Sequence, residues 1–304
     1  MAAARAPFKW LGGKGRMLAK LRPLVPDHRT YLEPYCGSAA LLFAKAPAEV
    51  ETVNDLHEGI TNLFRVLRDE SEEFMRLARL TEYSRALWVE CRDTWQDEVD
   101  PVRRAWKWWY VACTSFSGWW GSAWGNVVTH SSRGSASVCA AFRTRIEVVL
   151  PECIRRLQGV QIENVDALRA IERYCTEDGF CYVDPPYVGD ERAVESYDSR
   201  DPAGHDMRST EEHAALVARL LDTPGCVLLS GYDHEVYDPL RAAGWGCISW
   251  QTSCYAAART RASGIQGPGS SSSMQPRTET AWLNPKLQEW TEQRAEMLFE
   301  GMDV

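Results

Sequence analysis

Short apolar runs and stretches of helical periodicity alternate along most of the chain. The apolar runs are bounded by turn residues, which is typical of buried strands. The stretches between them carry apolar side chains three and four positions apart, which predicts helices packed on one face. Such an alternation favours an open α/β sheet with helices on both faces. Strands are expected at 30–33, 50–55, 160–165, 180–183, 226–230 and 245–252, and helices include 56–67, 210–221 and 234–243.

One long segment lacks the strand pattern. Residues 71–98, 101–117 and 138–157 are amphipathic at helical spacing, with no strand-like run among them. We therefore expect an inserted, mainly helical lobe over 71–158. The α/β domain would then consist of 1–70 and 159–304. At 304 residues the chain is long enough for both parts.

The first two predicted strands have the order of a nucleotide-binding unit. A small-residue turn with the sequence EPYCG, at 33–37, follows the first strand, and Asp55 ends the second. In sheets of this kind a glycine lets the backbone approach the ligand, and the acid accepts hydrogen bonds from ribose hydroxyls. The glycine pattern is incomplete, because Ala39 stands where a second glycine is expected. Alone, the turn is a weak indication of a nucleotide-like cofactor.

A segment near the amino terminus also suits a bound cofactor. Residues 8–14 contain aromatic side chains, paired glycines and a lysine directly before a stretch of helical periodicity. Paired glycines allow close backbone approach, and the start of a helix favours anionic groups. Trp10 offers a face that can stack on a purine, and Lys14 adds a positive charge. The alternative is an ordinary helix start with an incidental tryptophan.

Asp184, Pro185, Pro186 and Tyr187 follow the apolar run at 180–183. Because proline fixes φ and has no N–H, this corner is expected to be rigid before a substrate binds. It would present a carboxylate, a free carbonyl at Pro185 and an aromatic face at one place. These groups suit chemistry on the exocyclic amine of a nucleobase. The alternative is a strand that ends in an acid and two prolines because these residues favour turns.

Together, the three segments resemble the Dam-like DNA adenine-N6 methyltransferases. That family has the same order: a Lys-Trp-x-Gly-Gly-Lys element, a Glu-Pro-aromatic-x-Gly turn, an acid-ended second strand, a recognition insert and Asp-Pro-Pro-Tyr. The resemblance implies a Rossmann-like methyltransferase sheet, S-adenosylmethionine as cofactor and double-stranded DNA as partner. It implies catalytic roles for Asp184, Pro185, Pro186 and Tyr187. It also implies that the cofactor is bound by Trp10, Lys14, Glu33, Pro34, Gly37, Asp55, Asp166 and Asp184.

Tryptophan is concentrated in the middle of the helical segment. Six of the 13 tryptophans lie between 106 and 124, and Gly and Ser alternate with them from 117 onward. Such clusters usually belong to a core. A Gly- and Ser-rich loop can also present aromatic and arginine side chains to a duplex or a displaced base. On this second interpretation the DNA contacts are Trp119, Trp120, Asn126, Arg133 and Arg143.

The net charge of −8 does not favour a nucleic-acid partner, but the positive charge is unevenly placed. Lys and Arg outnumber Asp and Glu by seven to one over 1–30, by eight to two over 101–161 and by three to none over 252–278. These regions are expected to form a surface that contacts phosphates. A solvated charge pattern with no partner is the alternative.

The ten cysteines never occur as Cys-x-x-Cys, which favours buried free thiols over zinc ligands or a disulfide framework. We therefore expect no metal. The same absence argues against a zinc deaminase, another enzyme that acts on flipped bases. No stretch is long and apolar enough to cross a membrane, so we expect a cytoplasmic protein, bacterial or phage-encoded, without a membrane partner.

These features predict a site-specific DNA methyltransferase that transfers a methyl group from S-adenosylmethionine to the N6 amine of an adenine flipped out of the duplex. A cytosine-N4 methyltransferase and an RNA adenine methyltransferase with the same grip remain open alternatives. A DNA-binding regulator with an inactive methyltransferase core is an alternative of a different class. A cognate restriction endonuclease, as in restriction–modification systems, is a partner that the prediction allows.

Overall fold

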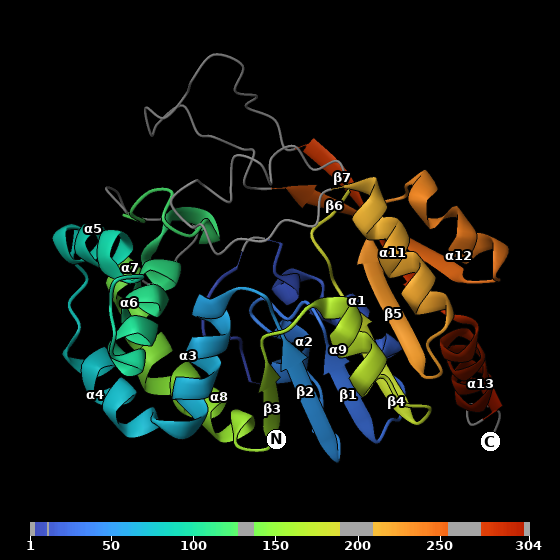
Figure 1. The fold of residues 1–304 in the computed structure, drawn as a ribbon, viewed down its shortest axis with the longest axis horizontal. Coiled ribbons are helices and arrows are strands. Elements are labelled where there is room, and N and C mark those ends of the chain that lie inside the picture. The colour runs from blue at the N-terminus through green and yellow to red at the C-terminus, as the bar shows by residue number, and fades with distance from the viewer. Residues whose placement is uncertain (1–3, 11, 127–136, 189–208, 255–274, 301–304) are drawn as a thin grey trace.

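A seven-stranded sheet carries the fold, with helices on both faces (Figure 1). The computed structural model describes residues 4–10, 12–126, 137–188, 209–254 and 275–300. The strand order is β3-β2-β1-β4-β5-β7-β6, and β7 is antiparallel to both of its neighbours, whereas the other adjacent pairs are parallel. This confirms the predicted Rossmann-like α/β class. The strands are β1 (Thr30–Glu33), β2 (Val50–Asn54), β3 (Val160–Glu163), β4 (Gly179–Val183), β5 (Cys226–Gly231), β6 (Gly246–Cys254) and β7 (Gln275–Leu283).

The central strands bury side chains on both faces, as continuous apolar runs predict. Phe180 and Tyr182 of β4 belong to the hydrophobic cluster on one face, and Cys181 and Val183 to the cluster on the other. Neighbouring β1 divides in the same way. Successive strand residues point to opposite faces, so one short apolar run contributes to two cores.

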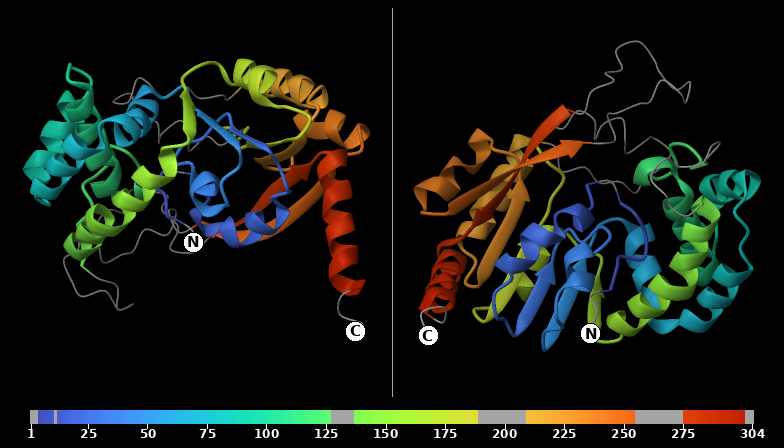
Figure 2. Two further views of the ribbon diagram at one scale, coloured as in Figure 1. Left: turned by 90° about the horizontal axis from the view of Figure 1, so that it is seen from below. Right: turned by 180° about the vertical axis from the view of Figure 1, so that it is seen from behind.

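Figure 2 shows how helices cover the two faces of the sheet. α9 (Ala167–Tyr174), α11 (Thr210–Leu221) and α12 (Asp238–Ala242), which follows the 3-10 turn η5 (Glu235–Tyr237), lie on one face. The other face carries α1 (Leu18–Leu21), α2 (Ala40–Ala44) and α13 (Pro285–Glu300). The 3-10 turns η1 (Lys14–Arg16) and η2 (Arg22–Leu24) flank α1.

The predicted insert is helical and lies beyond the β3 edge of the sheet, next to α3 (Glu58–Asp69) (Figure 1). The helix expected at 71–98 is two helices, because Ser84 accepts a hydrogen bond from the amide of Leu87 and starts a new one. The helix expected at 138–157 is continuous, with a π-helical middle. The insert contains α4 (Ser71–Leu80), α5 (Arg85–Thr94), α6 (Pro101–Thr114), η3 (Phe116–Gly118), α7 (Val138–Thr144), π-helix η4 (Arg145–Val149) and α8 (Leu150–Leu157).

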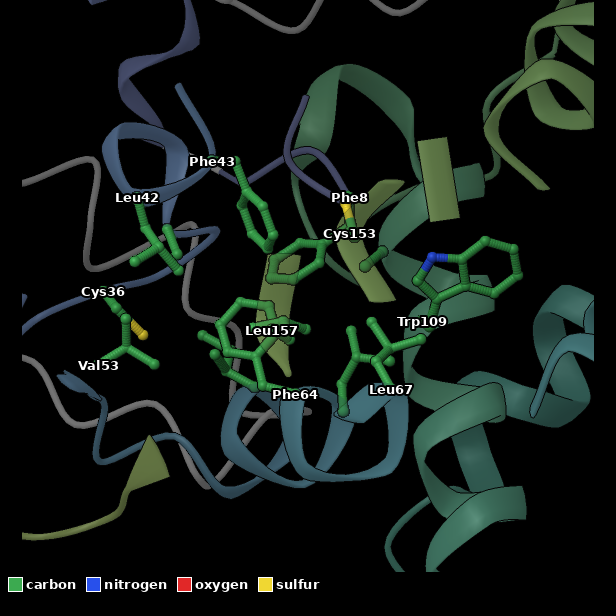
Figure 3. Close-up of a cluster of buried hydrophobic side chains, with 14 of the residues drawn as sticks. Phe8, Cys36, Leu42, Phe43, Val53, Phe64, Leu67, Trp109, Cys153 and Leu157 are labelled. Carbon is green, nitrogen blue, oxygen red and sulfur yellow. The ribbon is translucent and has the colours of Figure 1, made fainter. Parts of the chain in front are cut away.

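The insert and the sheet share one hydrophobic core. Figure 3 shows Trp109 of α6 and Leu157 of α8 in the same cluster as Phe43 of α2. Buried ion pairs add a second connection, because Glu51 of β2 accepts hydrogen bonds from Lys45 at 2.5 Å and from Nη2 of Arg156, on α8, at 2.8 Å. The last helix of the insert is therefore fastened directly to the sheet.

Gly59 of α3 lies against the indole of Trp108 at this junction. A Cβ added at Gly59 would lie 2.4 Å from Trp108 Nε1. The indole has no room to move, because it is fully buried and packs on Phe8, with ring centroids 5.0 Å apart, and on Trp10, at 5.8 Å.

We expect Gly59→Ala to lower the free energy of unfolding by about 1–3 kcal/mol, the usual cost of overpacking a core. Urea unfolding followed by tryptophan fluorescence measures this change. Gly159→Ala is the control, because a Cβ there meets nothing within 4 Å. Equal unfolding free energies for the two variants would show that the junction accommodates a methyl group.

Nine cysteines whose side chains the structure describes are free thiols, and four of them are buried as predicted: Cys36, Cys91, Cys153 and Cys181. Cys139 and Cys247 are exposed, so burial is not general. Within the described ranges, no helix has the length and apolar character needed to cross a bilayer.

Candidate active site

The three strands that carry the predicted site are neighbours in the sheet. β2, β1 and β4 lie side by side, and after their carboxyl ends come Asp55, the turn at 34–37 and Asp184. The chain passes from β1 to β2 on one side, whereas β4 lies on the other. β1 and β4 therefore flank the point where the strand order reverses, and ligands of open α/β sheets bind at such a point.

Asp55 holds the turn after β1 in place. Its Oδ2 accepts a hydrogen bond from the amide of Gly37 at 2.8 Å, and its Oδ1 accepts one from the amide of His57 at 2.9 Å. Gly37 has a φ of 47°, in the left-handed region that glycine adopts without cost. Its Oδ2 also lies 4.0 Å from Cys36 Sγ. A carboxylate has about four acceptor positions, so a ligand hydroxyl can share this carboxylate with the backbone.

Ala39 also adopts a left-handed conformation, with a φ of 51°, and it is the one described non-glycine residue with positive φ. It precedes α2, and its amide donates to the carbonyl of Cys36 at 2.6 Å. The sequence showed alanine where glycine was expected. Glycine would suit this position better, because the left-handed conformation costs an alanine about 1 kcal/mol.

The amino-terminal segment packs on this turn. A Cβ added at Gly37 would lie 2.9 Å from Cδ1 of Trp10, so the indole and the turn backbone are in close contact. The Trp10 ring is itself set edge-on against Phe8 and His57, with centroid distances of 6.0 and 5.6 Å. The structure thus brings together Trp10, Gly37 and Asp55, which lie far apart in the sequence.

Lys14 and Asp184 form an ion pair at the end of β4. The Lys14 Nζ lies 2.6 Å from Asp184 Oδ1, and these side chains are 9% and 17% exposed. The same ammonium donates to the carbonyl of Gly12 at 3.0 Å. Burial raises the pKa of Asp184 above its ordinary value, while the Lys14 charge opposes that shift. The amino-terminal segment therefore contacts both the turn after β1 and the carboxylate of Asp184.

Tyr187 completes the corner that begins with Asp184, Pro185 and Pro186. Its hydroxyl donates to Glu279 Oε2 at 2.9 Å, and its ring meets Tyr232 at a centroid distance of 4.6 Å in a T-shaped arrangement. Lys14 Nζ lies 4.9 Å from the ring centroid. Burial raises the pKa of Tyr187 well above the usual value, so the phenol stays protonated at neutral pH.

Glu279 and Tyr232 were not predicted as site residues. Glu279 lies in the strand that the alternating pattern at 278–285 indicates, where a charged side chain is expected to face solvent. Tyr232 directly follows β5. Because ligands of such sheets bind at the carboxyl ends of the strands, this position could have identified Tyr232 as a candidate.

Glu33, which is predicted to bind the cofactor, is a buried side chain. It is 2% exposed, and its Oε1 accepts hydrogen bonds from the Tyr31 hydroxyl at 2.6 Å and from the amide of Leu42 at 2.7 Å. Glu33 thus joins β1 to α2 beneath the turn, and its burial argues against direct contact with a cofactor. Burial raises its pKa to about 7, although both hydrogen bonds favour the charged form.

Glu33→Gln is expected to change the pH dependence of stability. Between pH 4.5 and about 7 the unfolded carboxyl ionises while the folded one retains its proton, so Glu33 makes the protein less stable as pH rises. The ionised form costs roughly 3 kcal/mol above pH 7. The effect of Glu33→Gln on the unfolding free energy should therefore become more favourable by about 2–3 kcal/mol between pH 4.5 and 8. Urea unfolding across this pH range measures the effect, with the exposed Glu289→Gln as control. The same dependence of unfolding free energy on pH in both variants would contradict the buried, protonated state of Glu33.

Two further predicted cofactor residues lie beside the turn. Pro34 is buried, and its carbonyl accepts a hydrogen bond from Asn54 Nδ2 at 2.9 Å. Asn54 also bonds both backbone groups of Val165, so it joins the loops after β1 and β3. Asp166 is exposed and caps α9 through the amides of Leu168 and Arg169. Asp166 is the last residue before α9, where an acid is expected to cap a helix. Because its side chain is exposed, a bound cofactor could contact it.

The predicted DNA-binding residues are not equally accessible. Trp120 is 7% exposed, stacks on Trp108 and donates to its carbonyl at 3.2 Å, so it is a core residue and its burial argues against direct DNA contact. Trp119 is half-buried and Asn126 is exposed. Exposed Arg143 donates to the carbonyl of Arg79 at 2.9 Å. Arg133 lies outside the described residues.

A cavity of about 280 Å³ lies elsewhere, near the amino end of β1. Its lining comes from the segments at 22–28 and 45–47, and it contains none of the residues at the Asp184 corner. We place the site at the carboxyl ends of the strands because the ion pair, the strained turn and the aromatic corner meet there. Within the described ranges, no three His, Cys, Asp or Glu side chains are grouped as metal ligands.

Comparison with protein families shows which family the chain is part of. The family model for D12 class N6 adenine-specific DNA methyltransferases matches residues 10–218. The match begins at Trp10 and includes the turn, Asp55 and the Asp184 corner. The chain belongs to this family. The match also includes the whole helical insert.

Individual relatives are similar over shorter stretches. The type II methyltransferase M1.LlaDCHI of Lactococcus lactis subsp. cremoris is 27% identical over 197 residues, covering 60% of this chain and 66% of that protein. The DNA N-6-adenine-methyltransferase of Escherichia phage P1 is 30% identical over 74 residues, covering 24% and 10%. The DNA adenine methylase of Serratia marcescens is 25% identical over 109 residues, covering 34% and 40%. The matches thus span just under two thirds of the first relative and less of the others.

Proposed function

We propose that this protein transfers a methyl group from S-adenosylmethionine to the N6 amine of adenine in double-stranded DNA. The observation that carries the proposal is the Asp184 carboxylate, 17% exposed, which lies 2.6 Å from Lys14 at the end of β4, next to the strand whose following turn is hydrogen-bonded to Asp55. Membership of the adenine-N6 family supports the same reaction.

The residues around the turn fit the proposed cofactor. Gly37 leaves the turn without a side chain, Asp55 can accept from a ribose hydroxyl, and Trp10 offers an aromatic surface beside it. Bound there, S-adenosylmethionine would supply an electrophilic methyl group. The neighbouring carboxylates of Asp184 and Glu279 give the site a negative potential that suits a sulfonium cation.

Asp184 and the Pro185 carbonyl would activate the target amine. The lone pair of the adenine amine is shared with the ring, so the amine is a poor nucleophile. When each of its hydrogens is accepted by an oxygen, the nitrogen moves toward a tetrahedral arrangement and the lone pair can face the methyl donor. Asp184 can do this while keeping Lys14, since a carboxylate has about four acceptor positions. The acceleration would come from placement and electrostatics.

The target base would have to leave the duplex. The amine of a paired adenine lies within the duplex, out of reach of a mostly buried carboxylate such as Asp184. Enzymes that modify bases therefore rotate the nucleotide outward. Tyr187 is placed beside Asp184 and would stack on the extruded ring.

We also propose that 71–158 recognises the DNA target. This segment is helical, lies beside the catalytic sheet and holds the half-buried Trp119 and the exposed Asn126 and Arg143. Contacts from Trp119, Asn126, Arg133 and Arg143 belong to this proposal. Because one relative is named a type II methyltransferase, a cognate restriction endonuclease is part of this proposal. A cytoplasmic location is proposed as well.

Incubation with labelled S-adenosylmethionine and plasmid DNA, followed by mass spectrometry of the nucleosides, tests the proposed reaction. We expect N6-methyladenine. Methylcytosine, or methylation of RNA alone, would favour one of the other enzymes with the same grip. Cofactor binding without transfer would favour a DNA-binding regulator with an inactive core.

A further inference from the structure

Tyr187 is held by groups from three separate parts of the chain. Lys14 comes from the amino-terminal segment, Tyr232 from the end of β5 and Glu279 from β7. Glu279 makes a hydrogen bond to the phenol at 2.9 Å, whereas the other two make ring contacts. The hydrogen bond therefore fixes the position of the hydroxyl, and with it the long axis of the side chain. The contacts with Tyr232 and Lys14 limit rotation of the ring about that axis.

We propose that Glu279 is a positioning residue for methyl transfer, which orients Tyr187 for stacking on the target base. This inference rests on the proposed function. It adds a residue from the last strand of the sheet to a site that the sequence places on the amino-terminal segment and the first four strands.

The topology of the sheet places Glu279 at this point. β7 runs antiparallel between β5 and β6. Thr280, the residue after Glu279, pairs with Gly231, the last residue of β5. Glu279 is therefore one residue beyond the end of β5, beside Tyr232, at the same edge of the sheet as Asp184. A carboxylate that is partly removed from water needs a donor, and the Tyr187 hydroxyl is one.

Glu279 also acts on Asp184 through its charge. Burial is the main reason that the pKa of Asp184 is raised; Lys14 opposes this shift, and the Glu279 carboxylate adds to it. Removal of the Glu279 charge should therefore lower the pKa of Asp184. The titratable or charged groups that act on Asp184 are Lys14, Tyr187 and Glu279, and Asp184 in turn raises the pKa values of Glu33 and Tyr182.

The test compares Glu279→Ala, Glu279→Gln, Tyr187→Phe and the double variant Tyr187→Phe/Glu279→Ala. We expect Glu279→Ala to lower kcat at least tenfold with a smaller change in KM for DNA. Tyr187→Phe should lower kcat similarly. At a pH above the acid limb, where the Glu279 charge no longer changes the protonation of Asp184, the double variant should be close to Tyr187→Phe, because Tyr187→Phe already removes the Tyr187–Glu279 hydrogen bond.

Glu279→Gln separates positioning from a general loss of structure. Its amide oxygen still accepts from the phenol, so it should restore most of the kcat that Glu279→Ala loses. Because the negative charge is gone, the acid limb of its pH–kcat profile should move to lower pH. Exposed Glu289→Gln, on α13 outside the proposed recognition segment, is the control for the charge change and should leave kcat, KM and the profile as in the wild type.

Independent, additive losses in the double variant would overturn the inference, as would a Glu279→Ala enzyme with wild-type kcat and pH profile. Either result with an active wild-type enzyme leaves the proposed function standing. An inactive wild-type protein would instead refute the proposed function, and this inference with it. If Glu279→Ala does not fold, the other two variants test the inference. It then requires the acid limb of Glu279→Gln to move to lower pH and the kcat of Tyr187→Phe to fall, and the absence of both changes would overturn it.

Discussion

Asp184→Asn is expected to lower kcat for methyl transfer by about a thousand-fold, the upper range for loss of one transition-state hydrogen-bonding group. The amide keeps the size of the side chain, but it carries no negative charge, and its NH₂ group is repelled by the hydrogens of the amine. Single-turnover transfer of labelled methyl groups to plasmid DNA measures the effect. S-adenosylmethionine binding should change far less.

Two controls accompany this measurement. Asp69→Asn removes an exposed carboxylate that pairs with Arg68, and it should leave kcat unchanged. The urea midpoint of Asp184→Asn should stay close to that of the wild type, because the amide oxygen can still accept from Lys14. Substantial turnover by a folded Asp184→Asn variant would contradict the role given to the carboxylate.

Gly37→Ala is expected to weaken S-adenosylmethionine binding by at least tenfold, which corresponds to about 1.4 kcal/mol. The new Cβ would lie 2.9 Å from the Trp10 ring, which Phe8 and His57 confine. Either the indole or the turn must shift, and both belong to the proposed cofactor surface. Isothermal titration calorimetry without DNA measures the affinity directly.

Gly159→Ala is again the matched control, since that glycine has open space and lies outside the site. Wild-type affinity in Gly37→Ala would show that the cofactor does not contact this turn. A loss of affinity accompanied by an equally large loss of stability would assign the effect to folding, so urea unfolding is measured in parallel.

Much of the fold follows from local signals in the sequence. The helix over 210–221 has the predicted bounds, because Ser209 and Glu212 form a reciprocal capping box at its start. The ends of β1 and β4 match the prediction, because the EPYCG turn and the Asp184 corner stop these apolar runs. The strand expected at 160–165 instead ends at Glu163. The prediction of one helix over 71–98 was wrong, because Ser84 caps a second helix there. Hydrophobic periodicity alone does not indicate such a cap.

The site was only partly predictable, because its decisive contacts join distant parts of the chain. The Lys14–Asp184 ion pair spans 170 positions and the Tyr187–Glu279 hydrogen bond spans 92. A motif can nominate Lys14 and Asp184 separately, but no local pattern pairs them. A motif also does not tell how deeply its residues are buried: Glu33 is 2% exposed and Trp120 is 7% exposed.

The most direct measurement is a crystal structure of the protein with a non-reactive S-adenosylmethionine analogue and a duplex whose target adenine has been mapped by sequencing. We predict an adenine outside the duplex, with its amine about 3 Å from the Asp184 carboxylate and the Pro185 carbonyl. The analogue should lie over Gly37 with its ribose at Asp55. An analogue bound away from this turn, or a target adenine still paired in the helix, would contradict the proposed mechanism.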